Sequence, residues 1–438
     1  MKYGPLDVQD RTNPSSFVIV LIASIALVLV TSLILSSFLL IQKVAAQPSV
    51  IKDTNLKVES LVSGLSSPTS MAFIDNNHIL VLEKDGNIRL VSNGQLQSQP
   101  VLHVSVDTTS ERGLLGIAVL NSNSISTTNN SNNNNKVVFL YYTESQGGEL
   151  RNRVYSYQWN GQSLINPKLI LDLPALPGPN HNAGKLAIGP DNYLYAVIGE
   201  LRHNGKLQNI KDGPDPDNTG VIFRVNPADG SPAKNNPFLN DPNVAMQRYY
   251  AYGIRNSFGI AFDPITGNLW ETENGEDTYD EINLIKPGFN GGWKIIMGPI
   301  SRNPGVSEND LVNFPGSHYA DPLFSWLKPV AVTATEFLKS SKLGPSYQNN
   351  LFVGDYKNGN LYFFKLNAER TAIQLDNSQQ ASGLSDLVVD NKNELNAVKF
   401  GTGFGGITDI KTGPDGYLYV LSILDGTLYR ISPVSVPQ

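Results

Sequence analysis

The sequence contains no cysteine, and only five of its 438 residues are histidine. The absence of cysteine excludes disulfides, thiolate catalysis and zinc sites built on cysteine. Charged residues make up 16% of the chain, which is low for a globular protein. Lysine and arginine form no dense run and the net charge is −6, so the composition argues against a nucleic-acid partner.

Long helical periodicity is also missing from the sequence after residue 54. What recurs instead is a short unit that joins Pro, Asp and Gly turn residues to a strand rich in β-branched and aromatic residues. Clear examples are residues 70–91, 189–197, 261–270, 350–355 and 413–431. Repetition of such a unit predicts a β-propeller, with two separate β-sandwiches as the alternative.

The one long apolar run lies near the N-terminus, where residues 17–41 carry no charge. A helix of that length, rising about 1.5 Å per residue, spans a bilayer core of about 30 Å. We therefore predict a cytoplasmic tail at 1–16, a transmembrane anchor or uncleaved signal at 17–42, a linker at 43–54 and the propeller at 55–434. Small residues at 44–46 leave a cleaved signal and a secreted protein as the alternative.

A low-complexity tract of Asn, Ser and Thr occupies residues 121–135. Such a composition buries no apolar surface, so we expect a loop between two strands.

His181 begins a glycine-bearing turn that is followed directly by an apolar strand pattern at residues 194–198. This order predicts an imidazole at the mouth of a β-rich fold. Histidine has an unperturbed pKa near neutrality, which suits it to proton abstraction. A structural histidine held by hydrogen bonds is the alternative.

Three further segments carry polar residues beside predicted strands. Arg255 and Asn256 precede a strand, so their side chains are expected at the same rim as His181. Residues 271–281 contain six carboxylates, whose oxygens suit Ca²⁺, although the spacing is not that of an EF-hand and a solvated acidic turn is the alternative. Lys357 lies at a turn after a strand.

Together, these segments resemble the soluble quinoprotein sugar dehydrogenases, the glucose/sorbosone dehydrogenase family. The resemblance covers roughly residues 57–432, and its motifs lie at residues 61–68, 111–117, 181–199, 255–256, 280–285, 290–293 and 409–419. It implies a six-bladed β-propeller that binds pyrroloquinoline quinone (PQQ) and Ca²⁺ on one face. The expected fold class is therefore all-β, a six-bladed β-propeller preceded by a single N-terminal transmembrane helix.

The resemblance also implies roles for the residues around the cofactor. His181 matches the general base that takes the proton of the sugar's anomeric hydroxyl, and Glu200 stands where the family has an aspartate that orients this histidine. Arg255 and Asn256 match residues that contact and polarise PQQ, which makes Arg255 a catalytic as well as a cofactor-binding candidate. Lys357 matches a lysine that binds the quinone.

Metal and substrate positions follow from the same motifs. Gly275 and Glu276 match two backbone carbonyls that hold the cofactor's Ca²⁺, and Glu281 with the Gly291 carbonyl matches a further Ca²⁺ site. Glu111 is the implied substrate-binding residue.

Two positions depart from the family pattern. Thr408 stands where the family usually has an arginine that grips a carboxylate of PQQ, and Lys185 replaces the arginine common after the histidine motif. Lys399 or Lys411 is a candidate to compensate, although a lysine does not copy the bidentate fork of an arginine.

The function predicted on this basis is PQQ-dependent oxidation of aldose sugars to lactones by a membrane-anchored enzyme outside the cytoplasm, with electrons passing to an external acceptor. Loss of the arginine at Thr408 favours an alternative, a non-catalytic propeller that binds carbohydrate or a protein partner. The acidic segment supports a third function, metal-dependent hydrolysis.

Overall fold

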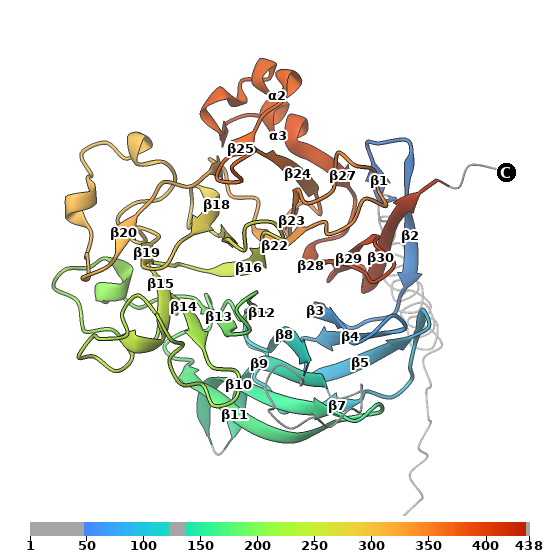
Figure 1. The fold of residues 1–438 in the computed structure, drawn as a ribbon, viewed down its shortest axis with the longest axis horizontal. Coiled ribbons are helices and arrows are strands. Elements are labelled where there is room, and N and C mark those ends of the chain that lie inside the picture. The colour runs from blue at the N-terminus through green and yellow to red at the C-terminus, as the bar shows by residue number, and fades with distance from the viewer. Residues whose placement is uncertain (1–47, 122–135, 147, 435–438) are drawn as a thin grey trace, which may run out of the picture. The chain divides into compact units, whose positions relative to one another are not determined.

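The computed structural model describes residues 48–121, 136–146 and 148–434, and Pro48–Gln438 form one compact unit. The strands of this unit pair into six sheets, which we number in chain order (Figure 1). Sheet 1 consists of β3 (Pro68–Phe73), β4 (His78–Glu83), β5 (Asn87–Ser92), β6 (Gln95–Leu96) and β7 (Leu102–His103). Sheet 2 consists of β8 (Leu114–Asn121), β9 (Lys136–Gln146), β10 (Glu149–Trp159) and β11 (Leu164–Pro174). Sheet 3 consists of β12 (Leu186–Ile188), β13 (Leu194–Ile198), β14 (Val221–Val225), β15 (Tyr249–Tyr252), β19 (Phe289–Asn290) and β20 (His318–Tyr319).

The second half of the unit forms the other three sheets and the helices. Sheet 4 consists of β16 (Ser257–Phe262), β17 (Leu269–Glu273), β18 (Asp280–Ile285), β21 (Phe324–Trp326) and β26 (Val388–Val389). Sheet 5 consists of β22 (Val332–Phe337), β23 (Leu351–Asp355), β24 (Leu361–Leu366), β25 (Ile373–Gln374), β27 (Lys399–Thr402) and β1 (Val50–Ile51). Sheet 6 consists of β28 (Ile407–Thr412), β29 (Leu418–Ser422), β30 (Thr427–Pro433) and β2 (Leu56–Val62). The helices are α2 (Asn377–Ala381) and α3 (Lys392–Val398), with 3-10 turns at Lys206–Gln208, Met246–Arg248, Ile300–Arg302, Glu308–Asp310 and Leu384–Asp386.

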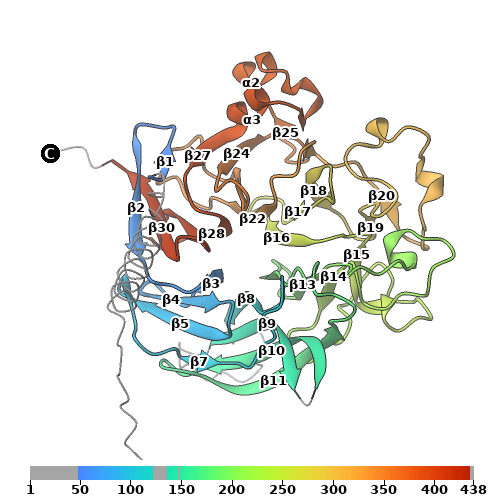
Figure 2. The same cartoon turned by 180° about the vertical axis from the view of Figure 1, so that it is seen from behind.

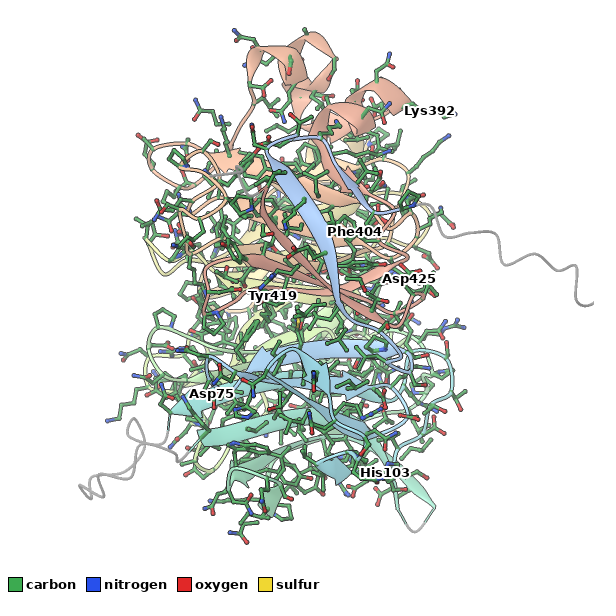
Figure 3. All side chains as sticks on the ribbon, turned by 90° about the vertical axis from the view of Figure 1, so that its right-hand side faces the viewer. Asp75, His103, Lys392, Phe404, Tyr419 and Asp425 are labelled. Atoms are coloured by element: carbon green, nitrogen blue, oxygen red, sulfur yellow. The ribbon has the colours of Figure 1, made fainter. Side chains whose placement is uncertain are left out.

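The sheets are arranged as a ring, with the first strand of each sheet closest to the centre (Figures 1 and 2). Each of these strands contacts the first strand of the next sheet, from β3 through β8, β12, β16 and β22 to β28. The last of them, β28, contacts β3 and closes the ring. In the side view, Asp75 and His103 mark sheet 1, and Tyr419 and Asp425 mark sheet 6 above it (Figure 3).

Sheet 6 joins the two ends of the described chain. Strand β2 pairs antiparallel with β30, in a register that runs from Leu56 opposite Pro433 to Val62 opposite Leu428. The outer edge of the last sheet is therefore supplied by a segment that precedes the first sheet.

The hydrophobic core is divided among the spaces between neighbouring sheets. Six clusters of buried side chains each combine residues of two adjacent sheets, including the pair formed by sheets 6 and 1. Most strands have apolar side chains on both faces because each sheet packs against a neighbour on either side.

The turn residues that marked the repeat in the sequence form matching turns in sheets 3 and 6. The Asp191 side chain accepts the backbone N–H of Tyr193 at 3.2 Å and the hydroxyl of Tyr195 at 3.0 Å. Asp415 accepts the equivalent groups of Tyr417 and Tyr419 at 3.1 and 2.8 Å. These short-range hydrogen bonds explain why the strand boundaries could be predicted from the sequence.

The predicted fold class, an all-β six-bladed propeller preceded by a single transmembrane helix, is confirmed only as an all-β propeller; the predicted set of six blades and the predicted transmembrane helix are both corrected. The sheets are not a set of equal blades: sheets 3 and 4 add short parallel strands at their outer edges, β19, β20 and β26. Among the residues that the structure describes, no helix has the length and apolar character needed to cross a membrane. The predicted helix at 17–42 and the tail at 1–16 lie outside the described residues, and so does most of the tract at 121–135.

The predicted linker at 43–54 contains a strand in its described part. Val50 and Ile51 form β1 and pair with Thr402 and Gly401 of β27. This segment is therefore tied to sheet 5.

Candidate active site

A cavity of about 720 Å³ lies where the sheets meet, and residues of all six sheets or their loops line it. The predicted site residues in its lining are Glu111, His181, Arg255, Asn256, Gly275, Glu276 and Lys357. Three other predicted residues, Glu200, Glu281 and Gly291, lie outside the lining. The ring thus brings together polar residues that are far apart in the sequence.

His181 lies in a turn before β12, with its backbone in the left-handed region at a φ of 62°. Gly199 passes close behind it, since a Cβ on Gly199 would lie 2.2 Å from the His181 carbonyl oxygen. The His181 Nδ1 contacts the buried carboxylate of Glu200, and Nε2 has no hydrogen-bond partner among the described residues. Because the partner of one ring nitrogen sets the tautomer, this contact leaves the Nε2 lone pair free to accept a proton.

Glu111 connects His181 to the next predicted residue. Its Oε2 accepts the backbone N–H of His181 at 2.7 Å and the Asn256 side-chain amide at 3.0 Å. The Asn256 amide oxygen in turn accepts the backbone N–H of Ala183 at 3.2 Å. These three bonds fix the histidine turn against Asn256, so Glu111 positions the site as well as lining the cavity.

A buried glutamate holds the Arg255–Asn256 turn. Glu273 Oε1 accepts the backbone N–H groups of Arg255 at 2.9 Å and of Asn256 at 2.7 Å. The Arg255 guanidinium lies over the Trp293 ring, 5.2 Å from its centroid, and Nη1 donates to the Asn274 carbonyl at 2.9 Å. Its Nε is buried without a hydrogen-bond partner among the described residues. The guanidinium therefore keeps a donor that a ligand in the cavity can satisfy.

Burial of several carboxyl groups behind this turn raises their pKa values. Glu273 and Glu281 lie opposite each other on β17 and β18, with Glu271 on the same strand as Glu273. Burial raises the pKa of Glu271 to about 8 and that of Glu273 well above its ordinary value. The neighbouring carboxyls raise these pKa values further, and hydrogen bonds lower them. Burial also raises the pKa of Glu281 to about 7. A proton shared among these groups reduces the repulsion between them.

The loop with the predicted Ca²⁺ carbonyls is fixed by Asp280. This carboxylate accepts the N–H of Gly275 at 3.0 Å and those of Val330 and Val332 at 2.8 and 3.1 Å. Burial raises the pKa of Asp280 to about 6. The carbonyl oxygens of Gly275 and Glu276 accept none of the hydrogen bonds formed within the described residues. Two uncommitted carbonyls at a cavity fit the oxygen donors that Ca²⁺ prefers.

The second predicted Ca²⁺ site, which consists of Glu281 and the Gly291 carbonyl, has a different environment. Glu281 Oε1 accepts the N–H of Gly298 at 2.6 Å, and its Oε2 accepts the Asn283 amide at 3.1 Å. Gly291, the other predicted ligand, donates its N–H to the Tyr252 carbonyl at 2.9 Å. Within the described ranges, no three His, Asp or Glu side chains are grouped so that they could hold a metal. The protein's own hydrogen bonds thus occupy the Glu281 carboxylate.

The opposite side of the cavity, which we call the open wall, consists of Tyr356, Lys357, Ile423 and Leu424 from sheets 5 and 6. Tyr356 is 44% exposed and Leu424 is 66% exposed. The Lys357 Nζ makes only a long bond, 3.3 Å, to the Pro329 carbonyl. This wall carries apolar surface and one weakly bonded cation. We call the other side, formed by Glu111, His181, Arg255 and Asn256, the braced wall, because buried carboxylates hold it in place.

The departures from the family pattern lie between these two walls. Thr408 lines the cavity, and its hydroxyl donates to the Pro68 carbonyl at 2.9 Å, which links sheet 6 to sheet 1. Lys185 lines the cavity as well, whereas Lys399 and Lys411 do not belong to its lining. Thr408 is thus a neutral, satisfied residue at the position of the expected arginine.

Sequence reasoning missed the residues that brace the site. Glu273 and Asp280 were part of the acidic segment, but neither was assigned a role. Their signal was the location of acids within strand patterns: all five residues of β17 are buried, including Glu271 and Glu273. A buried carboxylate must be paired, which points to backbone N–H groups nearby.

Comparison with known proteins gives the same picture. The family described as Glucose / Sorbosone dehydrogenase matches residues 65–430. The chain is 26% identical over 389 residues to the aldose sugar dehydrogenase YliI of Escherichia coli (strain K12), across 86% of this chain and 93% of that protein. It is 29% identical over 308 residues to quinoprotein glucose dehydrogenase B of Acinetobacter calcoaceticus, across 64% of this chain and 61% of that protein.

The fold has the same relatives. The PQQ-bound form of an aldose sugar dehydrogenase from Streptomyces coelicolor superposes with a TM-score of 0.62 at 24% identity, across 86% of this chain and 98% of that structure. This likeness concerns the fold. Because the family match extends over most of the propeller and includes the residues of both walls, the chain belongs to the glucose/sorbosone dehydrogenase family.

Proposed function

We propose that this protein is a PQQ-dependent aldose dehydrogenase that oxidises the anomeric carbon of an aldose to a lactone. The observation that carries the proposal is His181, which lines the cavity with Nδ1 on a buried carboxylate and Nε2 free of partners among the described residues. The names of the relatives, an aldose sugar dehydrogenase and a quinoprotein glucose dehydrogenase, support the same reaction.

The donor set of the cavity fits the cofactor and its metal. Arg255 offers an unpartnered buried N–H, Asn256 and Lys357 add further donors, and the carbonyls of Gly275 and Glu276 suit Ca²⁺. When bound, PQQ supplies a quinone that accepts a hydride. We assign the binding of this group to Arg255, Asn256 and Lys357.

His181 performs the proton transfer in this proposal. The anomeric hydroxyl of the aldose loses its proton to Nε2 while the C–H bond of the anomeric carbon gives up a hydride. The sugar therefore loses two electrons and two hydrogens overall. Glu200 stabilises the imidazolium that forms, because its carboxyl group is buried and in contact with Nδ1. Glu111 and Asn256 keep the histidine turn in place.

We also propose that the oxidation takes place outside the cytoplasm, with transfer of electrons to an external acceptor. The apolar run at 17–41 supports export, whether the run is retained or removed. Cell fractionation and an intact mass for the mature chain test this part, and a cytoplasmic enzyme would contradict it.

The second candidate is a propeller of this family that binds carbohydrate or a protein partner without redox chemistry. Thr408 favours it, because the cavity lacks the arginine expected on sheet 6. No observation favours the metal-dependent hydrolase.

Titration with PQQ and Ca²⁺, followed by dye-linked oxidation of a panel of aldoses, separates the two candidates. The dehydrogenase binds PQQ and reduces the dye, and His181→Gln lowers the rate about 10²–10⁴-fold with PQQ binding retained. His203→Gln is the matched control, because His203 pairs with Asp217 and does not line the cavity. Wild-type protein that binds no PQQ and oxidises no aldose would establish the second candidate.

A further inference from the structure

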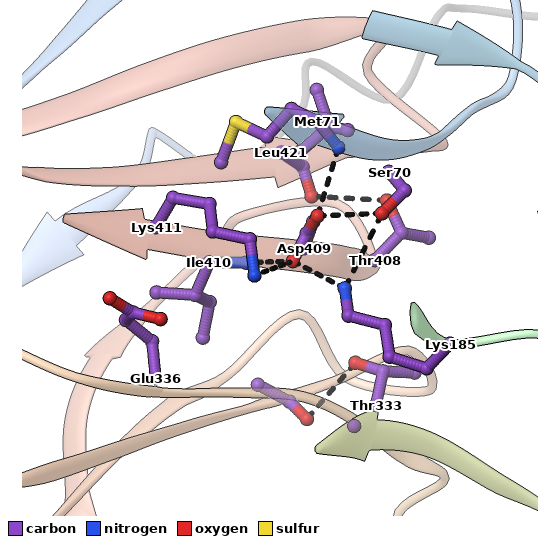
Figure 4. Close-up of polar contacts among 12 residues, drawn as sticks. Ser70, Met71, Lys185, Thr333, Glu336, Thr408, Asp409, Ile410, Lys411 and Leu421 are labelled. Carbon is purple, nitrogen blue, oxygen red and sulfur yellow. Dashed lines mark hydrogen bonds and ion pairs between the residues drawn. The ribbon is translucent and has the colours of Figure 1, made fainter. Parts of the chain in front are cut away.

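A buried lysine, Lys185, and a half-buried one, Lys411, share one carboxylate beside the cavity (Figure 4). Asp409 Oδ1 is 2.6 Å from the Lys185 Nζ and 3.6 Å from the Lys411 Nζ. The other oxygen of Asp409 accepts the Ser70 hydroxyl at 2.8 Å and the Met71 N–H at 2.9 Å. Among the described residues, Asp409 is thus the only carboxylate within ion-pair distance of either lysine.

The remaining acid near the cluster, Glu336, forms no ion pair with either lysine. Glu336 lies on the far side of Lys411 from Lys185 (Figure 4) and accepts the Thr412 hydroxyl at 2.9 Å. Among the described residues, the ion pairs of Lys411 within 4 Å include Asp409 but not Glu336. Asp409 is therefore the one close anionic partner of the buried Lys185 amine among the described residues, so an anion in the adjoining space would add a favourable contact.

Lys185 is the member of the cluster that reaches the cavity. It lines the cavity with its side chain 4% exposed, whereas Lys411 is not in the lining. A lysine has three N–H donors; the Lys185 amine uses one on Asp409 and a second, at the long distance of 3.4 Å, on Ser70. The amine thus has a donor left for a group in the cavity.

The charge state of the two partners is consistent with this reading. Burial lowers the pKa of Lys185 to about 8, against the opposing effect of Asp409, so the amine remains mostly protonated at neutral pH. Burial acts against ionisation of Asp409, but Lys185 and Lys411 hold its pKa below the ordinary value. The Lys185 amine and the Asp409 carboxyl group are therefore both charged at neutral pH.

Thr408 gives a ligand access to this amine. It precedes Asp409, lines the same cavity, and its short side chain is turned to the Pro68 carbonyl. An arginine at this position would extend over the region that Thr408 leaves clear. We propose that Lys185 anchors a carboxylate of the bound cofactor and takes over the role of the arginine that Thr408 replaces. This inference rests on the proposed function, because it assigns a residue to the cofactor named there.

The rival cation on this side of the cavity is Lys84. It also lines the cavity, but its Nζ donates to the Thr108 carbonyl at 2.8 Å, toward the loop before sheet 2. Lys84 is thus a comparison residue for the test.

Lys185 and Lys411 provide a matched pair of variants, since each is a cation on the same carboxylate and only Lys185 lines the cavity. We expect Lys185→Gln to weaken PQQ binding about 10- to 100-fold in calorimetry or absorbance titration, the effect of losing one hydrogen bond to a charged group. Lys411→Gln should leave the affinity within about threefold of wild type, because that residue makes no contact with the ligand. Thr408→Arg should restore binding in the Lys185→Gln background.

Thermal melting of each variant without cofactor controls for folding, and Lys185→Met, an uncharged side chain of similar length, replaces Lys185→Gln if the amide disturbs the fold. The inference would be overturned by equal losses of PQQ affinity in the Lys185 and Lys411 variants, by no loss in either, or by a loss confined to Lys84→Gln. In each of these cases, PQQ binding by the wild type would leave the proposed function standing. Wild-type protein that binds no PQQ would instead refute the proposed function, and the inference with it.

Discussion

The two walls of the cavity differ in how they are built. On the braced wall, Glu200, Glu111 and Glu273 receive ring or backbone N–H groups of His181, Arg255 and Asn256. On the open wall, Tyr356 and Leu424 are exposed and Lys357 makes one long hydrogen bond. Chemistry that depends on the position of a lone pair needs a rigid frame, whereas recognition of a variable ligand tolerates a softer one. In the proposed function, this difference places proton transfer on the first wall and leaves selection among sugars to the second.

The largest effect is expected when the braced wall loses the charge behind the histidine. Glu200→Gln should lower the aldose oxidation rate about 10²–10⁴-fold, because the imidazolium loses its counter-charge and the ring its preferred tautomer. Glu200→Asp, which keeps the carboxylate, should retain more activity than the amide. Rates measured with saturating PQQ and Ca²⁺ check this, and an active Glu200→Gln variant would remove the carboxylate from the mechanism.

Calcium probes the edge of the braced wall where Asp280 holds the Gly275–Glu276 loop. A ligand that binds only the folded state at a hundredfold excess over its Kd stabilises that state by about 2.7 kcal/mol. We expect EDTA to lower the melting temperature of the propeller and added Ca²⁺, but not Mg²⁺, to restore it. An unchanged melting temperature would remove Ca²⁺ from the site.

The region between the walls can be strengthened with a single substitution. Thr408→Arg adds a bidentate cation where the chain has a neutral residue, and a charge-assisted hydrogen bond is worth about 1.5–3 kcal/mol. PQQ affinity should rise about 10- to 150-fold, as measured by calorimetry. Thr408→Lys provides the control, because it adds charge without the fork and should give a smaller gain. Equal affinities for Lys185→Gln with and without Thr408→Arg would mean that no carboxylate approaches this position.

The buried carboxyls behind the braced wall predict a dependence of stability on pH. Burial raises the pKa of Asp280 to about 6, of Glu281 to about 7 and of Glu271 to about 8, all above their values in the unfolded chain. Unfolding therefore releases protons between about pH 4 and pH 8, so stability falls as pH rises through this window. The melting temperature should be higher at pH 5 than at pH 8.

Two variants sharpen this test. Glu271→Gln stays neutral at both pH values, so it should reduce the difference in melting temperature by about 1 °C for each 1 kcal/mol of the dependence that it removes. Glu59→Gln is the control, since contacts with Lys57 and Arg430 hold the Glu59 pKa at about 2, below the window. A flat profile for wild type would show that these carboxyls are paired with cations.

The smallest effect is expected on the open wall. Leu424→Ala removes an exposed side chain, so the melting temperature should stay within about 1 °C, as surface changes usually alter stability by less than 0.5 kcal/mol. KM should rise for some aldoses with kcat unchanged, because the side chain borders the cavity without contacting His181. A fall in kcat alone would contradict the division between the walls.

The parts of the molecule that local chemistry determines were predictable. The Pro/Asp/Gly turns indicated where the strands lie. The motif around His181 predicted an imidazole at the mouth of the fold, on the same rim as Arg255 and Asn256, and all three residues line the cavity. The braces were not predictable, because Glu111, Glu273 and Asp280 act through backbone N–H groups that only the closed ring brings near. Lys185 illustrates the same limit. The sequence pointed to Lys399 or Lys411 as a substitute for the arginine, but only the folded ring distinguishes a lysine in the cavity from one behind it.

The pairing of β2 with β30 has a consequence for biosynthesis. The outer strand β2 is made long before its partner β30, so the ring cannot close until residues 427–433 have left the ribosome. The cavity draws on every sheet and therefore forms only once β30 is in place. Removal of β30 would thus open the ring without changing any residue that lines the cavity.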